Sequence, residues 1–101
     1  MSFTTITPAA ATLNSPNGVT TSSPTYNWNK VNEATWYNLY VSGPSGYVFT
    51  NWYSTAQVCS ASICSVPATP GLTSGQYRWW IQTWNNVGYG PWSSGLNFSV
   101  P

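Results

Sequence analysis

Apolar and polar side chains alternate along several short stretches of the chain, and Gly or Pro residues separate these stretches. Between residues 77 and 84, for example, Trp79 and Ile81 alternate with Arg78 and Gln82. A period of two is typical of strands with one buried face, and no stretch holds a helical period long enough for a helix of about ten residues. We therefore predict seven strands, near residues 11–14, 24–29, 35–42, 47–53, 62–66, 76–85 and 96–100.

Seven short strands within 101 residues predict an all-β fold, in which two antiparallel sheets pack as a sandwich. The alternation also assigns the faces of two strands. The apolar sets, such as Tyr37, Leu39 and Val41, belong to the core. The more polar sets should face outward; they are Trp36, Asn38, Tyr40 and Ser42 in one strand and Arg78, Trp80, Gln82 and Trp84 in the other.

Charged side chains are rare in this sequence. Only Lys30, Glu33 and Arg78 are charged and the net charge is +1, whereas an average chain of this length carries about 25 charged residues. Without a basic cluster we expect no nucleic-acid partner and no electrostatic contact with a membrane surface. The apolar runs are also far shorter than the roughly 20 residues of a spanning helix, so we expect no membrane insertion.

The residues that carry most enzyme chemistry are missing. The chain has no histidine, one carboxylate side chain and two cysteines. These residues cannot build a Ser/His/Asp triad, a pair of catalytic carboxylates or an ordinary zinc site. We therefore expect a protein that is not an enzyme and that needs no cofactor and no metal.

Aromatic and uncharged polar residues dominate instead. Aromatic side chains make up 17% of the chain, which argues against disorder. Ser, Thr and Asn supply 37 residues, and a surface rich in hydroxyl and amide groups suits neutral, hydroxyl-rich partners. The N-terminus lacks the basic and apolar regions of a signal peptide, which indicates a module taken from a larger protein.

Two groups of spaced residues share a pattern with one known family. The first is Pro24-Thr-Tyr-Asn-Trp28 with Val31, Ala34, Tyr37, Leu39 and Val41, and it resembles strands B and C of fibronectin type III domains. The second group is similar to its E-F corner, strand F and F-G loop, and comprises Leu72, Gly75, Tyr77, Trp79, Ile81, Thr83, Asn85, Gly88, Gly90, Pro91, Trp92 and Ser93. The resemblance covers about residues 12–100.

This resemblance implies an immunoglobulin-like antiparallel sandwich over residues 12–101, with Trp28 in the core and Tyr77 near the E-F corner. Residues 1–11 mix Thr, Ala and Pro without a period, so we expect a linker or a loosely held N-terminal segment. Modules of this kind accompany polysaccharide-degrading enzymes and surface proteins of bacteria. The resemblance therefore implies an extracellular location, secreted or at the cell surface, with neighbouring domains as partners.

Cys59 and Cys64 are the only cysteines, and four residues separate them. Nothing near them offers the further ligands of a tetrahedral zinc, which favours a disulfide over two free buried thiols. A loop this short adds only roughly 2 kcal/mol in the chain-entropy model, so the bridge should order a local turn. A disulfide also implies an oxidising compartment.

The outward sets predict a strongly aromatic face. We expect strands 36–42 and 47–53 to pair with Ser42 opposite Tyr47, which places Phe49, Asn51 and Tyr53 outward, opposite Tyr40, Asn38 and Trp36. Strand 76–85 should pair on the other side, as the family topology implies. The predicted ligand-binding residues on this face are Trp36, Asn38, Tyr40, Arg78, Trp80, Gln82, Trp84 and Trp92.

Two functions fit such a face. The first is a carbohydrate-binding module, because the slightly negative face of an indole attracts the C–H groups on one side of a sugar ring. The alternative is a structural spacer or adhesin repeat. Its tryptophans would then stack with Arg78 in a ladder, through cation–π contacts, or pack against neighbouring domains or subunits.

Overall fold

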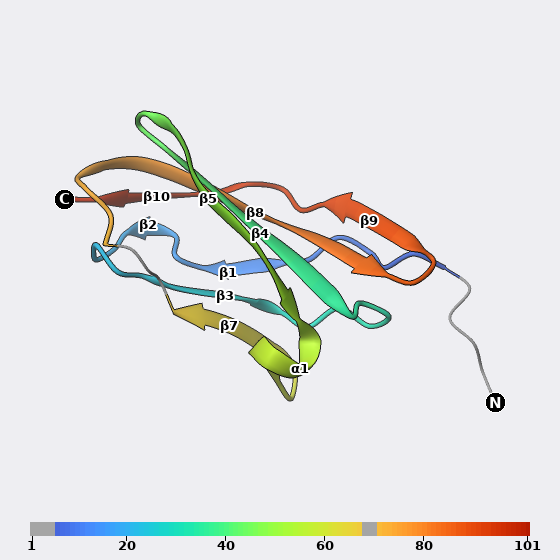
Figure 1. Ribbon diagram of the computed structural model, residues 1–101. Coiled ribbons are helices and arrows are strands. Elements are labelled where there is room, and N and C mark those ends of the chain that lie inside the picture. Colours follow the sequence, from blue (N-terminus) through green and yellow to red (C-terminus); the bar gives the residue numbers. More distant parts are fainter. Residues whose placement is uncertain (1–5, 68–70) are drawn as a thin grey trace.

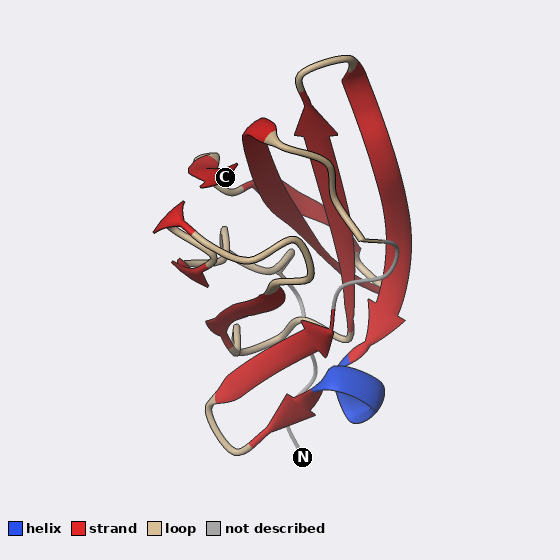
Figure 2. Cartoon of the chain, turned by 90° about the vertical axis from the view of Figure 1, so that its left-hand side faces the viewer, coloured by secondary structure: helices blue, strands red, loops and turns tan. Residues whose placement is uncertain are grey.

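The structure is a computed structural model that describes residues 6–67 and 71–101, and it shows two sheets packed as a sandwich (Figures 1 and 2). The smaller sheet has the order β1 (Leu13–Ser15), β3 (Thr25–Asn29), β7 (Ile63–Pro67) and β6 (Cys59–Ser60). The larger sheet has the order β2 (Gly18–Val19), β10 (Leu96–Val100), β8 (Gly75–Asn85), β4 (Trp36–Gly43) and β5 (Gly46–Ser54), and β9 (Gly88–Trp92) also pairs with β8. The all-β prediction is confirmed.

All seven predicted strands are present, with ends within two residues of those expected. The described residues also form three short strands that the sequence did not predict, β2, β6 and β9, and one helical turn, α1 (Thr55–Val58). Ser54 caps this turn, because its hydroxyl accepts the Gln57 N–H while the Gln57 side chain accepts the Ser54 N–H. No helix in the described residues is long and apolar enough to cross a membrane.

Large aromatic side chains fill the space between the sheets. Trp28 and Trp79 are fully buried, as are Tyr26 and Tyr37. The predicted core positions are therefore confirmed. The indole N–H of Trp79 donates to the carbonyl of Pro16 at 3.1 Å, which ties the larger sheet to the turn after β1.

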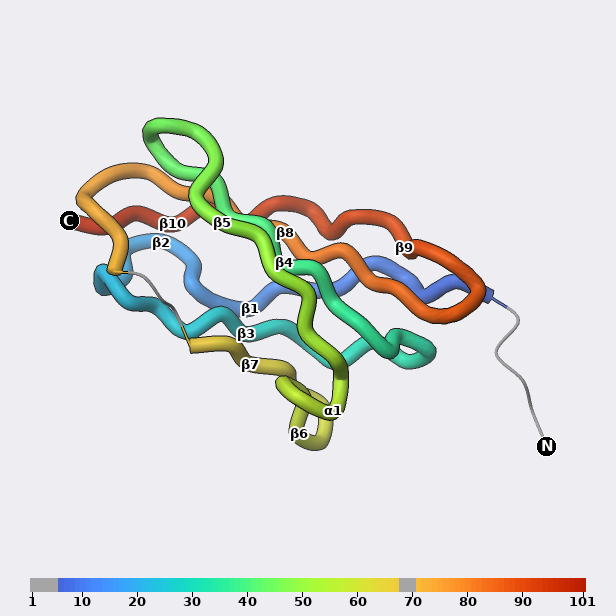
Figure 3. Tube along the Cα trace, in the orientation of Figure 1, coloured from blue at the N-terminus to red at the C-terminus, as the bar shows by residue number. Residues whose placement is uncertain are grey.

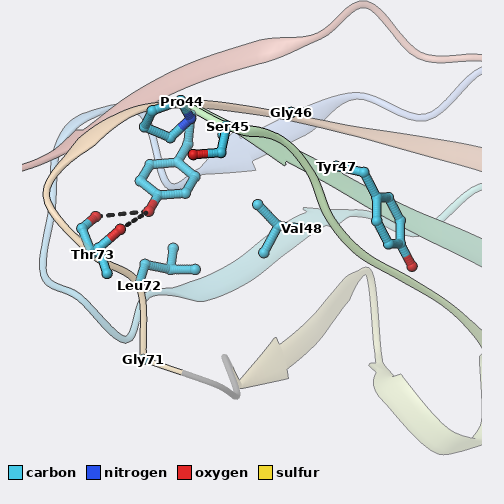
Figure 4. Close-up of a pocket in the computed structure, with 10 residues that line it drawn as sticks. Pro44, Ser45, Gly46, Tyr47, Val48, Gly71, Leu72 and Thr73 are labelled. Atoms are coloured by element: carbon cyan, nitrogen blue, oxygen red, sulfur yellow. Dashed lines mark hydrogen bonds between the residues drawn. The ribbon is translucent and has the colours of Figure 1, made fainter.

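Tyr77 forms the corner that the resemblance implies. Its ring stacks on Phe98 in the core, and its hydroxyl donates to the backbone carbonyl of Thr73 at 2.7 Å (Figure 4). A tyrosine at the start of a strand that bonds back to the preceding loop is typical of these sandwiches. The loop at Thr73 lies beside the β4–β5 turn, where Pro44 and Ser45 line the same small hollow (Figure 4).

The predicted register between β4 and β5 is wrong by one residue beyond the turn. Ser42 lies opposite Tyr47 as expected, but Val41 then pairs with Phe49 because a bulge interrupts the register. An extra residue in one strand reverses the side on which every later side chain lies. Phe49 and Tyr53 consequently pack against the core instead of facing outward.

The described part of the N-terminal segment, residues 6–11, runs beside β8 and β9 (Figure 3). The carbonyl of Ala9 accepts the Thr83 hydroxyl at 2.9 Å, and the carbonyl of Ile6 accepts the Asn85 amide at 2.9 Å. Thr83 and Asn85 are buried polar residues on the inner face of β8. The segment therefore supplies hydrogen-bond acceptors to the buried Thr83 hydroxyl and Asn85 amide at this end of the sandwich.

Candidate functional site

The outer face of the larger sheet is a grid of aromatic and amide side chains. Tyr40 of β4 lies opposite Trp80 of β8, and Trp36 lies opposite Trp84 four residues further along. The pair between them is polar, because Asn38 lies opposite Gln82. Aromatic pairs thus alternate with an amide pair along the two strands, and this grid forms because both strands alternate strictly between core and surface.

The first aromatic hollow has a volume of about 320 Å³ and is lined by Tyr40, Trp80, Trp92 and Ser93. The Tyr40 ring makes edge contacts with Trp80 and Trp92, at centroid distances of 5.6 and 6.2 Å. Ser93 anchors the wall of this hollow, since its N–H donates to Ile81 O and its hydroxyl accepts the Ile81 N–H. These bonds hold the start of the segment between β9 and β10 against β8.

The second aromatic hollow has a volume of about 350 Å³ and is lined by Trp36, Trp52, Trp84 and Tyr89. Trp36 and Trp52 each expose about two fifths of their surface, and Tyr89 exposes more than half. Trp52 reaches the face because the bulge in the β4–β5 pairing turns it outward. Its ring lies 6.0 Å from that of Tyr89.

Asn38 and Gln82 separate the two hollows, and each has one side of its amide already engaged. The Thr50 hydroxyl donates to Asn38 Oδ1 at 2.7 Å. Gln82 Nε2 donates to the carbonyl of Gly90 at 3.4 Å. Within the described residues, Asn38 Nδ2 and Gln82 Oε1 have no partner in the protein, so the face offers a free donor next to a free acceptor.

Arg78 is the one charged group on this face, and it is exposed at the end beyond the first hollow. Its guanidinium carbon lies 5.7 Å from the centroid of the Trp80 ring, which is a cation–π contact. The backbone at Gly95 lies against both groups, because a Cβ there would come within 2.6 Å of Arg78 Nε and 2.7 Å of Trp80 Nε1. In the described residues, Arg78 makes a cation–π contact with Trp80 but none with Trp92.

The structure brings all eight predicted face residues onto the outer side of one sheet. Sequence reasoning missed two residues of the second hollow, Trp52 and Tyr89. Trp52 was missed because the bulge shifts its parity, and Tyr89 because its stretch, rich in Gly and Pro, was expected to be a loop. The alternation of Gly88 and Gly90 with Tyr89 is a short period of two that could have indicated this part of β9.

Cys59 and Cys64 form the predicted disulfide, with Cα atoms 3.8 Å apart. The two residues face each other across the β6–β7 hairpin. The bridge lies in the smaller sheet and therefore closes a local turn, away from the aromatic hollows. Among the residues that the structure describes, no cluster of three potential metal ligands occurs.

No family model and no curated protein matches this sequence. Solved structures do match its fold. One is the chitinase ChiW from Paenibacillus sp. str. FPU-7, a bacterial cell-surface-expressed multi-modular enzyme, with a TM-score of 0.68, 14% identity, and coverage of 99% of this chain and 9% of that one. Another is a mutant fibronectin type III domain, FN3tt, with a TM-score of 0.55, 16% identity, and coverage of 89% of each chain.

The chain thus spans a small fraction of the chitinase and nearly all of the isolated domain. At these identities the likeness concerns the fold alone. It agrees with the two packed sheets, the buried Trp28 and the tyrosine corner at Tyr77. All strand pairs in these sheets are antiparallel except that of β2 with β10, which is parallel. The chain has the fold of a fibronectin type III-like domain.

Proposed function

We propose that this chain is a non-catalytic module of a secreted or cell-surface protein and that it binds a neutral polysaccharide on the outer face of its larger sheet. The observation that carries the proposal is the pair of aromatic hollows on that face, which together expose the rings of Tyr40, Trp80 and Trp92 and of Trp36, Trp52, Trp84 and Tyr89. Large exposed aromatic patches on a soluble domain commonly mark interaction sites.

The chemistry of the face fits sugar rings better than other ligands. An aromatic ring attracts the slightly positive C–H groups on one side of a sugar through its negative face. The amides of Asn38 and Gln82 can exchange hydrogen bonds with hydroxyl groups, which are both donors and acceptors. Arg78 is the only charged residue nearby, so the face has too little positive charge to neutralise a polyanion.

The fold neighbour and the disulfide support an extracellular setting. ChiW is described as a multi-modular enzyme expressed at the cell surface, and this chain matches one stretch of it in fold. A disulfide persists in oxidising compartments. We therefore include chitin among the polysaccharides to be tested.

The alternative is that the exposed tryptophans are structural, and the contact between Arg78 and Trp80 favours it. This contact involves only the first hollow. The second hollow has no charged side chain in its lining, so an arginine–tryptophan ladder gives its tryptophans no structural role.

The test is binding of the purified domain to chitin, cellulose, xylan and mannan, followed by substitution of one tryptophan from each hollow. Trp80→Ala and Trp84→Ala should each weaken binding by about 1–3 kcal/mol, the range found for stacking of planar rings on aromatic side chains. Binding should change little with salt, because no opposed charges drive it. Intrinsic fluorescence and pull-down with insoluble polymer measure both effects.

The control variant is Ile63→Ala, which removes an exposed apolar side chain from the smaller sheet and should leave binding unchanged. Far-UV spectra should show that every variant is folded. If no polysaccharide binds, or if Trp80→Ala and Trp84→Ala both unfold the domain, the structural alternative holds instead.

A further inference from the structure

The two aromatic hollows lie along the same pair of strands. The first centres on the Tyr40–Trp80 pair and the second on the Trp36–Trp84 pair, four residues away on each strand. At about 3.3 Å per residue, this places the hollows about 13 Å apart along the strands. A single sugar ring can stack in one hollow only, whereas a linked chain of sugars can reach both.

The amide pair between the hollows is oriented by the protein itself. Because the Thr50 hydroxyl donates to Asn38 Oδ1, the two N–H groups of that amide are left for a ligand. Because Gln82 donates to the Gly90 carbonyl, its own carbonyl oxygen is left to accept. A donor and an acceptor on neighbouring strands match adjacent sugar hydroxyls, one accepting and one donating.

Resting on the proposed function, we infer that the two hollows form one continuous site for an extended, neutral oligosaccharide that lies along β4 and β8. One sugar stacks in the hollow of Tyr40, Trp80 and Trp92. Another stacks in the hollow of Trp36, Trp52, Trp84 and Tyr89. The sugar between them bonds to Asn38 Nδ2 and Gln82 Oε1.

This arrangement makes affinity depend on ligand length. Once one sugar is stacked, contact with the other hollow becomes an intramolecular event and loses little additional freedom. Affinity should therefore rise steeply when the oligosaccharide becomes long enough to reach both hollows. Beyond that length it should rise little, because the next ring along this face, Tyr47, already contacts Tyr40 of the first hollow.

The experiment uses two probe series, 1,4-linked glucose oligomers and 1,4-linked N-acetylglucosamine oligomers, each from one to six units. Calorimetry of the intact domain should show at least about a tenfold rise in affinity with length for the series that binds. Trp80→Ala and Trp84→Ala should each abolish this rise and reduce long oligomers to the affinity of short ones. The double variant should lose binding altogether.

The amide pair is tested by Asn38→Asp, which keeps the size of the side chain but replaces its donor with a carboxylate oxygen. Affinity for long oligomers should fall about tenfold, as expected when a polar contact is lost in a site built to make it. Asn51→Asp is the matched control, because it adds the same charge on β5 opposite Leu39, on the other side of the sheet. It should change affinity little.

The outcomes separate this inference from the proposed function. If a polysaccharide of the panel binds but short and long oligomers bind equally, or if Trp84→Ala leaves the affinity for long oligomers unchanged, the continuous site is wrong and binding by one hollow remains. If neither the polysaccharides nor the oligomers bind, both proposals are wrong.

Discussion

Tyr26 and Trp28 each place a polar atom in the core of the sandwich. Both side chains are fully buried, and the Tyr26 hydroxyl and the Trp28 indole N–H have no hydrogen-bond partner in the described residues. The Tyr26 ring itself is well packed, with edge contacts to Trp79 and Phe98. Burial, and then the neighbouring Tyr77 and Tyr53 hydroxyls, raise the pKa of Tyr26. The ring therefore stabilises the core, while its hydroxyl costs free energy.

Tyr26→Phe should therefore raise the free energy of unfolding by about 1 kcal/mol, because it removes an unpaired hydroxyl and keeps the ring. In a domain of this size the Tm should rise by roughly 4–8 °C. The matched control is Tyr37→Phe, which should be destabilising because the Tyr37 hydroxyl accepts the Val31 N–H at 2.9 Å. Thermal unfolding measures both, and a loss of stability in Tyr26→Phe would mean that its hydroxyl has a bonding partner after all.

The alternation along single strands was enough to predict β4 and β8 and the faces of both. Trp36, Asn38, Tyr40 and their partners on β8 lie outward because these strands keep a strict period of two. The same reasoning assigned the faces of β5 the wrong way round. The bulge depends on how β4 and β5 pair, and the period of either strand alone does not indicate it. For this reason the second hollow was predicted only in part and its Trp52 was missed.

The β8–β9 hairpin and the N-terminal segment are closely packed against each other. Gly90 is buried in β9, and a Cβ at this position would overlap the Thr83 hydroxyl and the Pro8 carbonyl. The same hydroxyl donates to the carbonyl of Ala9. A small residue at position 90 therefore lets residues 6–11 lie against the hairpin.

Gly90→Ala should destabilise the domain by about 1–3 kcal/mol, because the added methyl group must displace either the N-terminal segment or Thr83. Urea unfolding measures the loss. Gly71→Ala is the control, since a Cβ there meets nothing closer than 4.0 Å, and it should stay within about 0.5 kcal/mol of the original chain. An unchanged Gly90→Ala midpoint would show that the segment does not pack against the hairpin in solution.

At the scale of the whole molecule, the scarcity of charge sets the response to pH. With three charged side chains and no histidine, almost nothing titrates between pH 4 and 9. Burial is the main cause that raises the pKa of both Tyr26 and Tyr37 above the ordinary value of 10.0. Burial disfavours the ionised form of these hydroxyls, so stability should stay constant below the unfolded pKa and fall as the pH rises above it.

We therefore expect Tm values at pH 4, 7 and 9 that agree within about 8 °C, and a progressive fall above about pH 10. Tyrosine absorbance should show that the loss of structure accompanies ionisation of the buried hydroxyls. A fall of stability on the acid side would mean that Glu33 or a chain terminus matters more than burial of the tyrosines.

The sandwich is 51 Å long, and the described chain begins at one end of that length and finishes at the other (Figure 1). Copies joined in tandem would extend in one direction and would repeat the outer face of the larger sheet, with its two aromatic hollows, at intervals of about this length. When one copy released a polymer strand, its neighbours would hold that strand close enough for rapid rebinding. If the module binds polysaccharide as proposed, a tandem array would therefore gain avidity for a long polymer without any new contact, while each copy kept the affinity of a single module.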